Sequence, residues 1–134
     1  MSIRINGNFE VTLQPQAAEE NVGDPSIGRM SIDKRFHGDL DGTSRGEMLS
    51  VRTDVAGSAG YVAIERVTGT LQGKQGSFAL QHSGIMKRGL PDLTITVIPD
   101  SGTGELAGII GSMRIDNVEG NHTYYFDYDF MVPA

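Results

Sequence analysis

The sequence predicts a single all-β domain, a closed antiparallel barrel of about eight strands. Three observations indicate this fold. The 134-residue chain carries 18 glycines spread along its length, and each glycine costs a helix interior about 1 kcal/mol relative to alanine. The segments between the glycines are short and alternate apolar with polar residues, which is the period of half-buried strands. Turn signals separate these segments at a spacing typical of an antiparallel meander.

Each expected strand lies between two clusters of turn residues. The strands span residues 8–14, 28–37, 45–53, 60–71, 76–83, 92–98, 104–115 and 121–131. Residues 16–21 have a helical composition, but Pro15 and Gly23 confine them to a turn or two. No second domain or linker is visible, so residues 1–134 form one domain with a core of about 6–131. The count leaves a sandwich or a barrel, and the barrel is favoured because closure removes exposed strand edges.

One hairpin can be given a register. Residues 60–71 meet 77–83 through a glycine-rich turn at 73–76. A symmetric turn places His82 opposite Val67 and makes Glu65 its diagonal neighbour on the same face. The other expected pairs are Leu71 with Phe78 and Gly69 with Leu80. The apolar residues of both strands then share one face, which supports this register.

Glu65 and His82 are the candidate catalytic pair. A carboxylate beside an imidazole orients its tautomer, and inside a barrel the two groups can act as a general acid and base. A buried structural hydrogen bond or ion pair would use the same two residues. Both interpretations require the two side chains to point inward.

Tyrosines and one arginine are the candidate ligand-binding residues. Tyr61, Tyr124 and Tyr128 share faces with apolar neighbours, so they either offer a hydroxyl to a ligand or fill the core. An inward Arg114 would bind a ligand carboxylate through its planar guanidinium, whereas an outward one is a solvated surface residue. Glu47 and Glu105 lie on strands whose inward face the sequence leaves open.

Composition excludes several function classes. The net charge is −6, from 11 Lys+Arg against 17 Asp+Glu, which disfavours nucleic acid and anionic membranes as partners. The chain has no cysteine, so disulfides and thiolate metal sites are excluded. The histidines show no metal-ligand spacing, and no cofactor is expected. No apolar run reaches the ~20 residues that span a bilayer, and no secretory signal is visible, so we expect a cytoplasmic protein.

Four segments carry a resemblance to a known family. They are GTSRGEML (42–49), GYVAIERVTG (60–69), GSFALQHSG (76–84) and PDSGTGELAG (99–108). Together they resemble the bacterial domain of unknown function 3224 over about residues 6–131. The resemblance implies a barrel like that of the allene oxide cyclases, which steer the cyclisation of a fatty-acid epoxide. No segment matches the active-site motif of those enzymes, so the resemblance implies no catalytic residue.

Two hypotheses about function follow. In the first, the barrel binds an apolar small molecule and acts as an isomerase or cyclase without a metal, with Glu65 and His82 inside and tyrosines lining the cavity. In the second, the barrel is a non-catalytic structural or interaction module filled by its own side chains. An apolar cavity above ~300 Å³ would favour the first. We also expect a homo-oligomer, to which the apolar strand 93–98 would contribute a surface.

Overall fold

The computed structural model of the protein describes residues 2–17 and 19–131. In this part of the chain nine strands form one antiparallel sheet, and no helix is present. The strands are β1 (Ile3–Pro15), β2 (Gly28–Gly38), β3 (Leu40–Arg52), β4 (Ala59–Leu71), β5 (Lys74–Lys87), β6 (Leu90–Val97), β7 (Thr103–Gly104), β8 (Ile109–Val118) and β9 (Asn121–Phe130).

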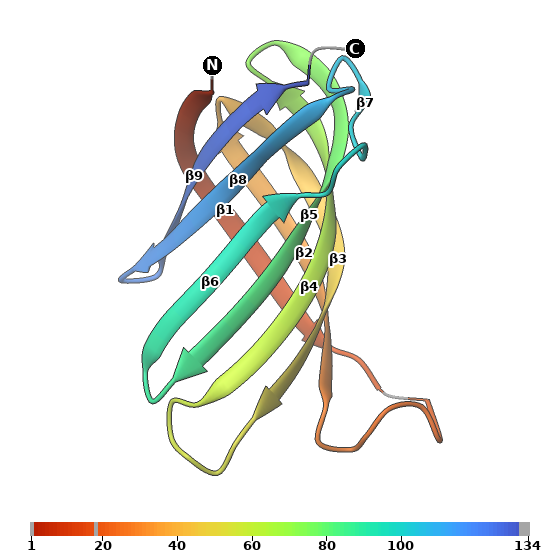
Figure 1. Ribbon diagram of the computed structural model, residues 1–134, viewed down its shortest axis with the longest axis vertical. Helices are drawn as coiled ribbons and strands as arrows, with labels where there is room; N and C mark the ends of the chain where they lie inside the picture. The colour runs from red at the N-terminus through yellow and green to blue at the C-terminus, as the bar shows by residue number, and fades with distance from the viewer. Residues whose placement is uncertain (1, 18, 132–134) are drawn as a thin grey trace.

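The sheet closes on itself. Its strand order is β4-β3-β2-β1-β9-β8-β6-β5, and pairing of β4 with β5 completes a ring of eight strands (Figure 1). The two-residue β7 lies outside this ring and pairs with Gly76 and Ser77 of β5. The predicted barrel is therefore confirmed, and the sandwich alternative is excluded.

Two local predictions differ from the structure. The expected strand 104–115 is split, because a turn over residues 105–108 separates β7 from β8. In the segment 16–21, expected to form a turn or two of helix, residue 18 lies outside the described residues, and Glu20 and Asn21 form a turn closed by the Val22 N–H donating to Glu19 O at 3.2 Å. Glycines at 102, 104 and 108 favour the turn in the first segment.

The register predicted for the β4–β5 hairpin is wrong by four residues. Leu71 pairs with Lys74 rather than Phe78, because Gln72 and Gly73 alone form the turn, with φ of 45° and 85°. An even shift leaves every side chain on its expected face. His82 now lies opposite Ala63 and is still diagonal to Glu65, through the other diagonal.

One half of the barrel, the half in which all eight strands are paired, is filled by side chains and is called the filled half below. Phe36, Phe78, Tyr124 and Phe126 are fully buried there, and the rings of Phe78 and Phe126 stack with centroids 5.6 Å apart. Smaller aliphatic side chains occupy the space between the rings, including Leu40, Leu71, Leu106 and Ile109. These buried side chains pack together and fill this half of the barrel interior.

The other half of the barrel lacks part of its wall. β8 pairs with β6 only at Ile95 and Thr96, and β9 pairs with β1 only over residues 3–9. The remaining lengths of β1 and β6 have one unpaired edge each, and β6 and β8 diverge in Figure 1. Strands β1 to β6 therefore form an open trough that continues from the filled half.

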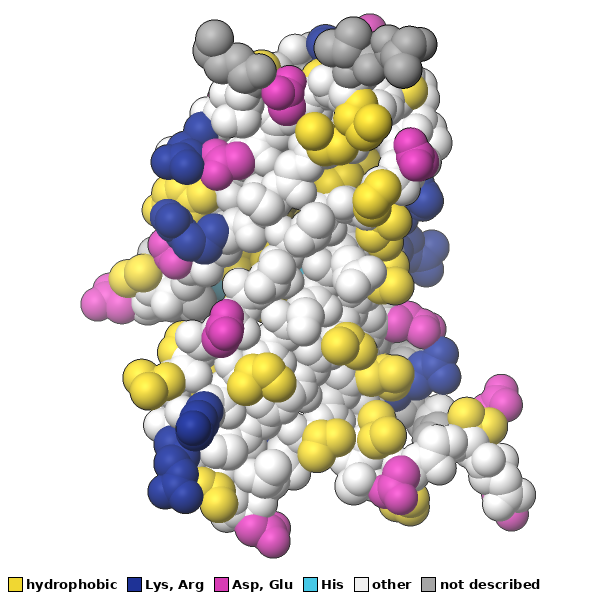
Figure 2. Space-filling view, in the orientation of Figure 1, with side chains coloured by type: hydrophobic (Ala, Val, Ile, Leu, Met, Phe, Trp, Pro, Cys, Tyr) yellow, Lys and Arg dark blue, Asp and Glu magenta, His cyan; other side chains and the backbone are white. Residues whose placement is uncertain are grey.

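The outer surface does not carry the expected apolar strand. Ile95 and Val97 are buried inside the barrel, and Thr94 and Thr96 form the outer face of β6. Figure 2 shows hydrophobic side chains scattered over the lower part of the face in view and gathered in a run at its upper right, with most charged side chains toward its margins. The association surface predicted at residues 93–98 is thus wrong, while association itself stays a prediction.

Candidate functional site

A group of polar side chains lies inside the barrel at the border between the filled and the open half. Lys34, Ser44, Glu65 and His82 are buried, and they come from β2, β3, β4 and β5. Each occupies an inward position of its strand, with apolar residues two positions away in β2, β4 and β5. Burial of such groups is costly unless they are paired, so their contacts decide what the group does.

Glu65 is the centre of this group. Its Oε2 accepts a hydrogen bond from Lys34 Nζ at 2.8 Å and one from His82 Nε2 at 2.7 Å. The Glu65 side chain is 0% exposed, that of His82 is 3% and that of Lys34 is 6%. The Lys34 ammonium also lies 5.2 Å from the centroid of the Phe9 ring, a cation–π contact. The carboxylate is therefore held between two donors out of contact with solvent.

Glu65 is ionised at neutral pH. Burial alone would raise the pKa of its carboxyl, but its contacts with His82 and Lys34 together outweigh burial and lower it to about 2. An ionised carboxylate only accepts hydrogen bonds. His82 Nε2 must therefore carry the hydrogen that Glu65 accepts, and in the neutral imidazole Nδ1 is left with its lone pair.

Tyr61 connects this buried group to the open half. Its hydroxyl lies 3.5 Å from His82 Nδ1, the long limit of a hydrogen bond, and the two ring centroids are 6.3 Å apart. Burial, and then the charge of Glu65, raise the pKa of Tyr61, so its hydroxyl keeps its proton at neutral pH. Gly84 makes room for the ring, since a Cβ there would lie 2.3 Å from Tyr61 Cε1. The order carboxylate, imidazole, hydroxyl thus runs from the core toward the trough.

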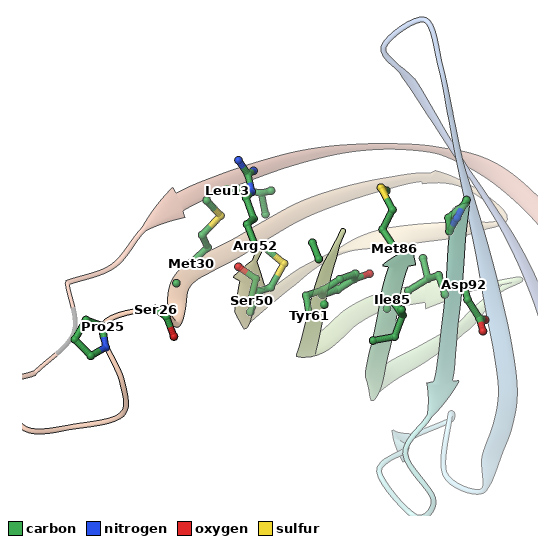
Figure 3. A pocket seen from close by; sticks show the side chains of 17 residues that line it. Leu13, Pro25, Ser26, Met30, Ser50, Arg52, Tyr61, Ile85, Met86 and Asp92 are labelled. Carbon is green, nitrogen blue, oxygen red and sulfur yellow. The ribbon is translucent and has the colours of Figure 1, made fainter. Parts of the chain in front are cut away.

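A pocket of about 690 Å³ occupies the trough (Figure 3). Tyr61 forms part of its wall, whereas Glu65 and His82 lie behind Tyr61 and do not line it. Most of the wall is apolar, including Leu13, Met30, Met48, Met86 and Leu93. Among the described residues that line the pocket, two are charged, Arg52 and Asp92. The pocket is a continuation of the barrel interior that opens to solvent.

The other two tyrosines do not reach this pocket. The Tyr124 hydroxyl donates to His37 O at 2.8 Å and accepts from Leu40 N at 3.2 Å, so it ties β9 to the β2–β3 turn. The Tyr128 hydroxyl donates to Gln72 Oε1 at the far end of the barrel. Both side chains point inward as predicted, and both belong to the filled half.

The remaining candidates lie on the outer surface. Arg114 is exposed on β8, and its guanidinium carbon lies 4.4 Å from the centroid of the Tyr125 ring, so the outward alternative applies. Glu47 pairs with Arg29 at 2.8 Å, and Glu105 accepts a hydrogen bond from Gln75 N at 3.1 Å. None of the three faces the pocket.

Sequence reasoning missed Lys34, although the signal was present. Ile32 and Phe36 flank it at the two-residue spacing, which places the lysine on the buried face of β2. A charge on an otherwise apolar face requires a partner, and Glu65 was the carboxylate already expected inside. Arg52 was missed too, because the strand predicted at 45–53 had no assigned inward face.

Two other kinds of site are absent from the described residues. No group of three or more His, Asp or Glu side chains able to hold a metal ion occurs in residues 2–17 and 19–131. The same residues contain no helix long and apolar enough to cross a membrane.

Comparison with known proteins gives a family and a solved structure. The sequence model of a family described as "Protein of unknown function (DUF3224)" matches residues 5–128. A crystal structure of a protein of unknown function from that family, from Shewanella oneidensis MR-1, is 47% identical in sequence. It superposes with a TM-score of 0.91 over 98% of this chain and 100% of that one. No curated protein matches.

Proposed function

The chain belongs to the DUF3224 family of proteins of unknown function, and we propose that its barrel binds a small apolar molecule in the pocket of the open half. The observation that carries this proposal is an apolar pocket of about 690 Å³ with Tyr61 in its wall and a buried ion pair behind it. Ligand sites typically measure about 300–1,000 Å³ and combine apolar walls with a few polar groups.

The polar groups support a proton transfer on the bound molecule. Tyr61 is the residue that touches the ligand, since it is the member of the group that lines the pocket. In the forward step, the Tyr61 oxygen accepts a proton from an acidic C–H or O–H of the ligand while its own proton passes to His82 Nδ1. The reverse transfer to a different ligand atom completes an isomerisation, with no net gain or loss of protons.

Glu65 and Lys34 act through His82. The Glu65 carboxylate stabilises the imidazolium that forms and keeps Nδ1 directed at Tyr61. Lys34 keeps Glu65 ionised before the transfer. These two are positioning residues. The isomerase or cyclase activity hypothesised from the sequence stays a prediction.

A structural module is the second candidate function. It is favoured by the filled half of the barrel, where Phe36, Phe78 and Phe126 are fully buried. In that case the Lys34–Glu65–His82 group would serve only to shape the core. Binding at the pocket distinguishes the two candidates.

Titration with the neutral fluorophore N-phenylnaphthylamine tests binding, because its emission rises when it leaves water for an apolar pocket. Ser50→Trp adds a large ring on the inward face of β3 beside Tyr61. Leu49→Trp adds the same ring on the exposed outer face of the same strand. We expect saturable binding by the parent protein and Leu49→Trp, and a loss of at least about tenfold in affinity in Ser50→Trp. No saturable binding by the parent protein would favour the structural module.

The proton transfer is tested separately with an apolar methyl ketone such as benzylacetone in D2O. Deuterium incorporation next to the carbonyl, followed by NMR, should exceed that in buffer alone. Tyr61→Phe removes the hydroxyl that contacts the ligand, and His82→Gln retains a donor toward Glu65 without a base toward Tyr61. Both variants should reduce exchange to the rate in buffer while still binding the fluorophore.

A further inference from the structure

Among the described residues that line the pocket, one is a cation, Arg52. Arg52 is the last residue of β3, and it follows Ser44, Met48 and Ser50 on the inward positions of that strand. It pairs with Ala59 in β4, which makes Tyr61 its diagonal neighbour on the same face. Figure 3 shows its side chain extending to the same side of the strands as Met86. The guanidinium therefore stands at the mouth of the apolar pocket.

Arg52 has no protein partner among the described residues. Other arginines of the barrel are paired: Arg4 with Asp127 at 2.6 Å, Arg29 with Glu47 at 2.8 Å and Arg35 with Asp41 at 2.6 Å. Those three stand on the outer surface, where water would also satisfy them. Arg52 thus differs from these three arginines in pointing toward the pocket and in having no described partner for its donors.

We infer that the pocket selects an amphiphilic anion, whose apolar body lies between the Met and Leu side chains and whose oxyanion head group binds Arg52. This inference rests on the proposed function, because it assigns a ligand class to the same pocket. A planar guanidinium forms two parallel hydrogen bonds to a carboxylate, sulfonate or phosphate. The aliphatic part of Arg52 continues the apolar wall beneath the head group.

The other charges of the protein do not favour anions, so the preference depends on Arg52 alone. Asp92 also lines the pocket, but it comes from β6, with β4 and β5 between it and Arg52. It alternates with the inward Leu93 and Ile95, and Figure 3 places Tyr61 and Met86 between it and Arg52. The net charge of −6 repels anions, so a preference for them requires a contact with a specific cation.

Two fluorophores with one body test the inference. Anilinonaphthalene sulfonate carries a sulfonate that N-phenylnaphthylamine lacks, and both are titrated into the same protein. Arg52→Gln removes the cation and keeps a polar side chain of similar length. Arg88→Gln is the matched control, because it changes the net charge equally from an exposed turn outside the pocket.

We expect the parent protein to bind the sulfonate about tenfold more tightly than the neutral probe, as a charge-assisted contact allows. Arg52→Gln should abolish this difference and leave the affinity for the neutral probe within about twofold, whereas Arg88→Gln should keep the difference. Raising NaCl from about 50 mM to about 500 mM should reduce the preference by screening.

The outcomes separate the two proposals. If the parent protein does not bind the neutral probe in a saturable manner, the proposal that the pocket binds a ligand is refuted. If it binds the neutral probe but shows no preference for the sulfonate, or if Arg52→Gln retains the preference, the assignment of an anionic ligand is overturned. The proposal that the pocket binds an apolar molecule is then retained.

Discussion

Replacement of Lys34 by methionine should destabilise the protein strongly, because it leaves the Glu65 carboxylate buried with one donor fewer. Both side chains are almost fully buried, at 6% and 0% exposure, and their atoms are 2.8 Å apart. Removal of one partner of such a pair costs about 3–5 kcal/mol, since the remaining charge stays out of water. Methionine keeps an unbranched side chain of similar volume, so the packing loss is small.

Urea unfolding at pH 7, followed by far-UV circular dichroism, measures this loss. A domain of this size is stable by about 5–15 kcal/mol in total, so the variant should unfold at a much lower urea concentration. The double variant Lys34→Met/Glu65→Leu removes both charges and should recover part of the loss, because an apolar pair replaces a buried ion pair at little cost. Recovery also shows that Lys34→Met fails through the unpaired charge rather than through misfolding.

Arg4→Met provides the control. It breaks an ion pair of similar length, 2.6 Å to Asp127, whose arginine side chain is 76% exposed, and such pairs contribute about 0–1 kcal/mol. If Lys34→Met lowers the unfolding free energy by no more than Arg4→Met does, then loss of Lys34 does not leave an uncompensated buried charge on Glu65. The reasoning about the centre of the site would then be refuted.

Three further predictions concern Glu65, the pocket wall at Gly84 and the hydrogen bonds of Tyr124. Because the pKa of Glu65 is lowered from 4.5 to about 2, its ionised form contributes stability above about pH 5 that is lost as the pH falls toward 2. Acid unfolding should therefore be less steep in Glu65→Gln than in the parent chain. Gly84→Ala should weaken binding of the neutral fluorophore, because the new Cβ displaces the Tyr61 ring; unchanged affinity would contradict this. Tyr124→Phe should lower the unfolding free energy by about 1–3 kcal/mol in urea titrations, since it leaves buried backbone groups near Leu40 without their partner, while probe binding stays unchanged.

Local pattern was enough to predict most of the strands and the inward faces of β4 and β5, while the strand count favoured a barrel over a sandwich. Alternation along β4 and β5 placed Glu65 and His82 inside even though the register was wrong by four residues, because an even shift preserves the faces. The same alternation held the information about Lys34, whose position between Ile32 and Phe36 was overlooked. Where glycines follow each other closely, as at residues 102–108, the pattern did not separate a turn from a strand.

The sequence by itself determined where most of the strands run and that Glu65 and His82 point inward, because these depend on a two-residue period that is local. Only the tertiary structure decided that Lys34 reaches Glu65 across β3, that Tyr61 stands between the ion pair and a pocket, and that Arg52 faces that pocket. Those arrangements depend on the residues at which the pairing of β8 with β6 and of β9 with β1 ends. The end of a pairing between distant strands is set by the closure of the whole barrel, which no local pattern encodes.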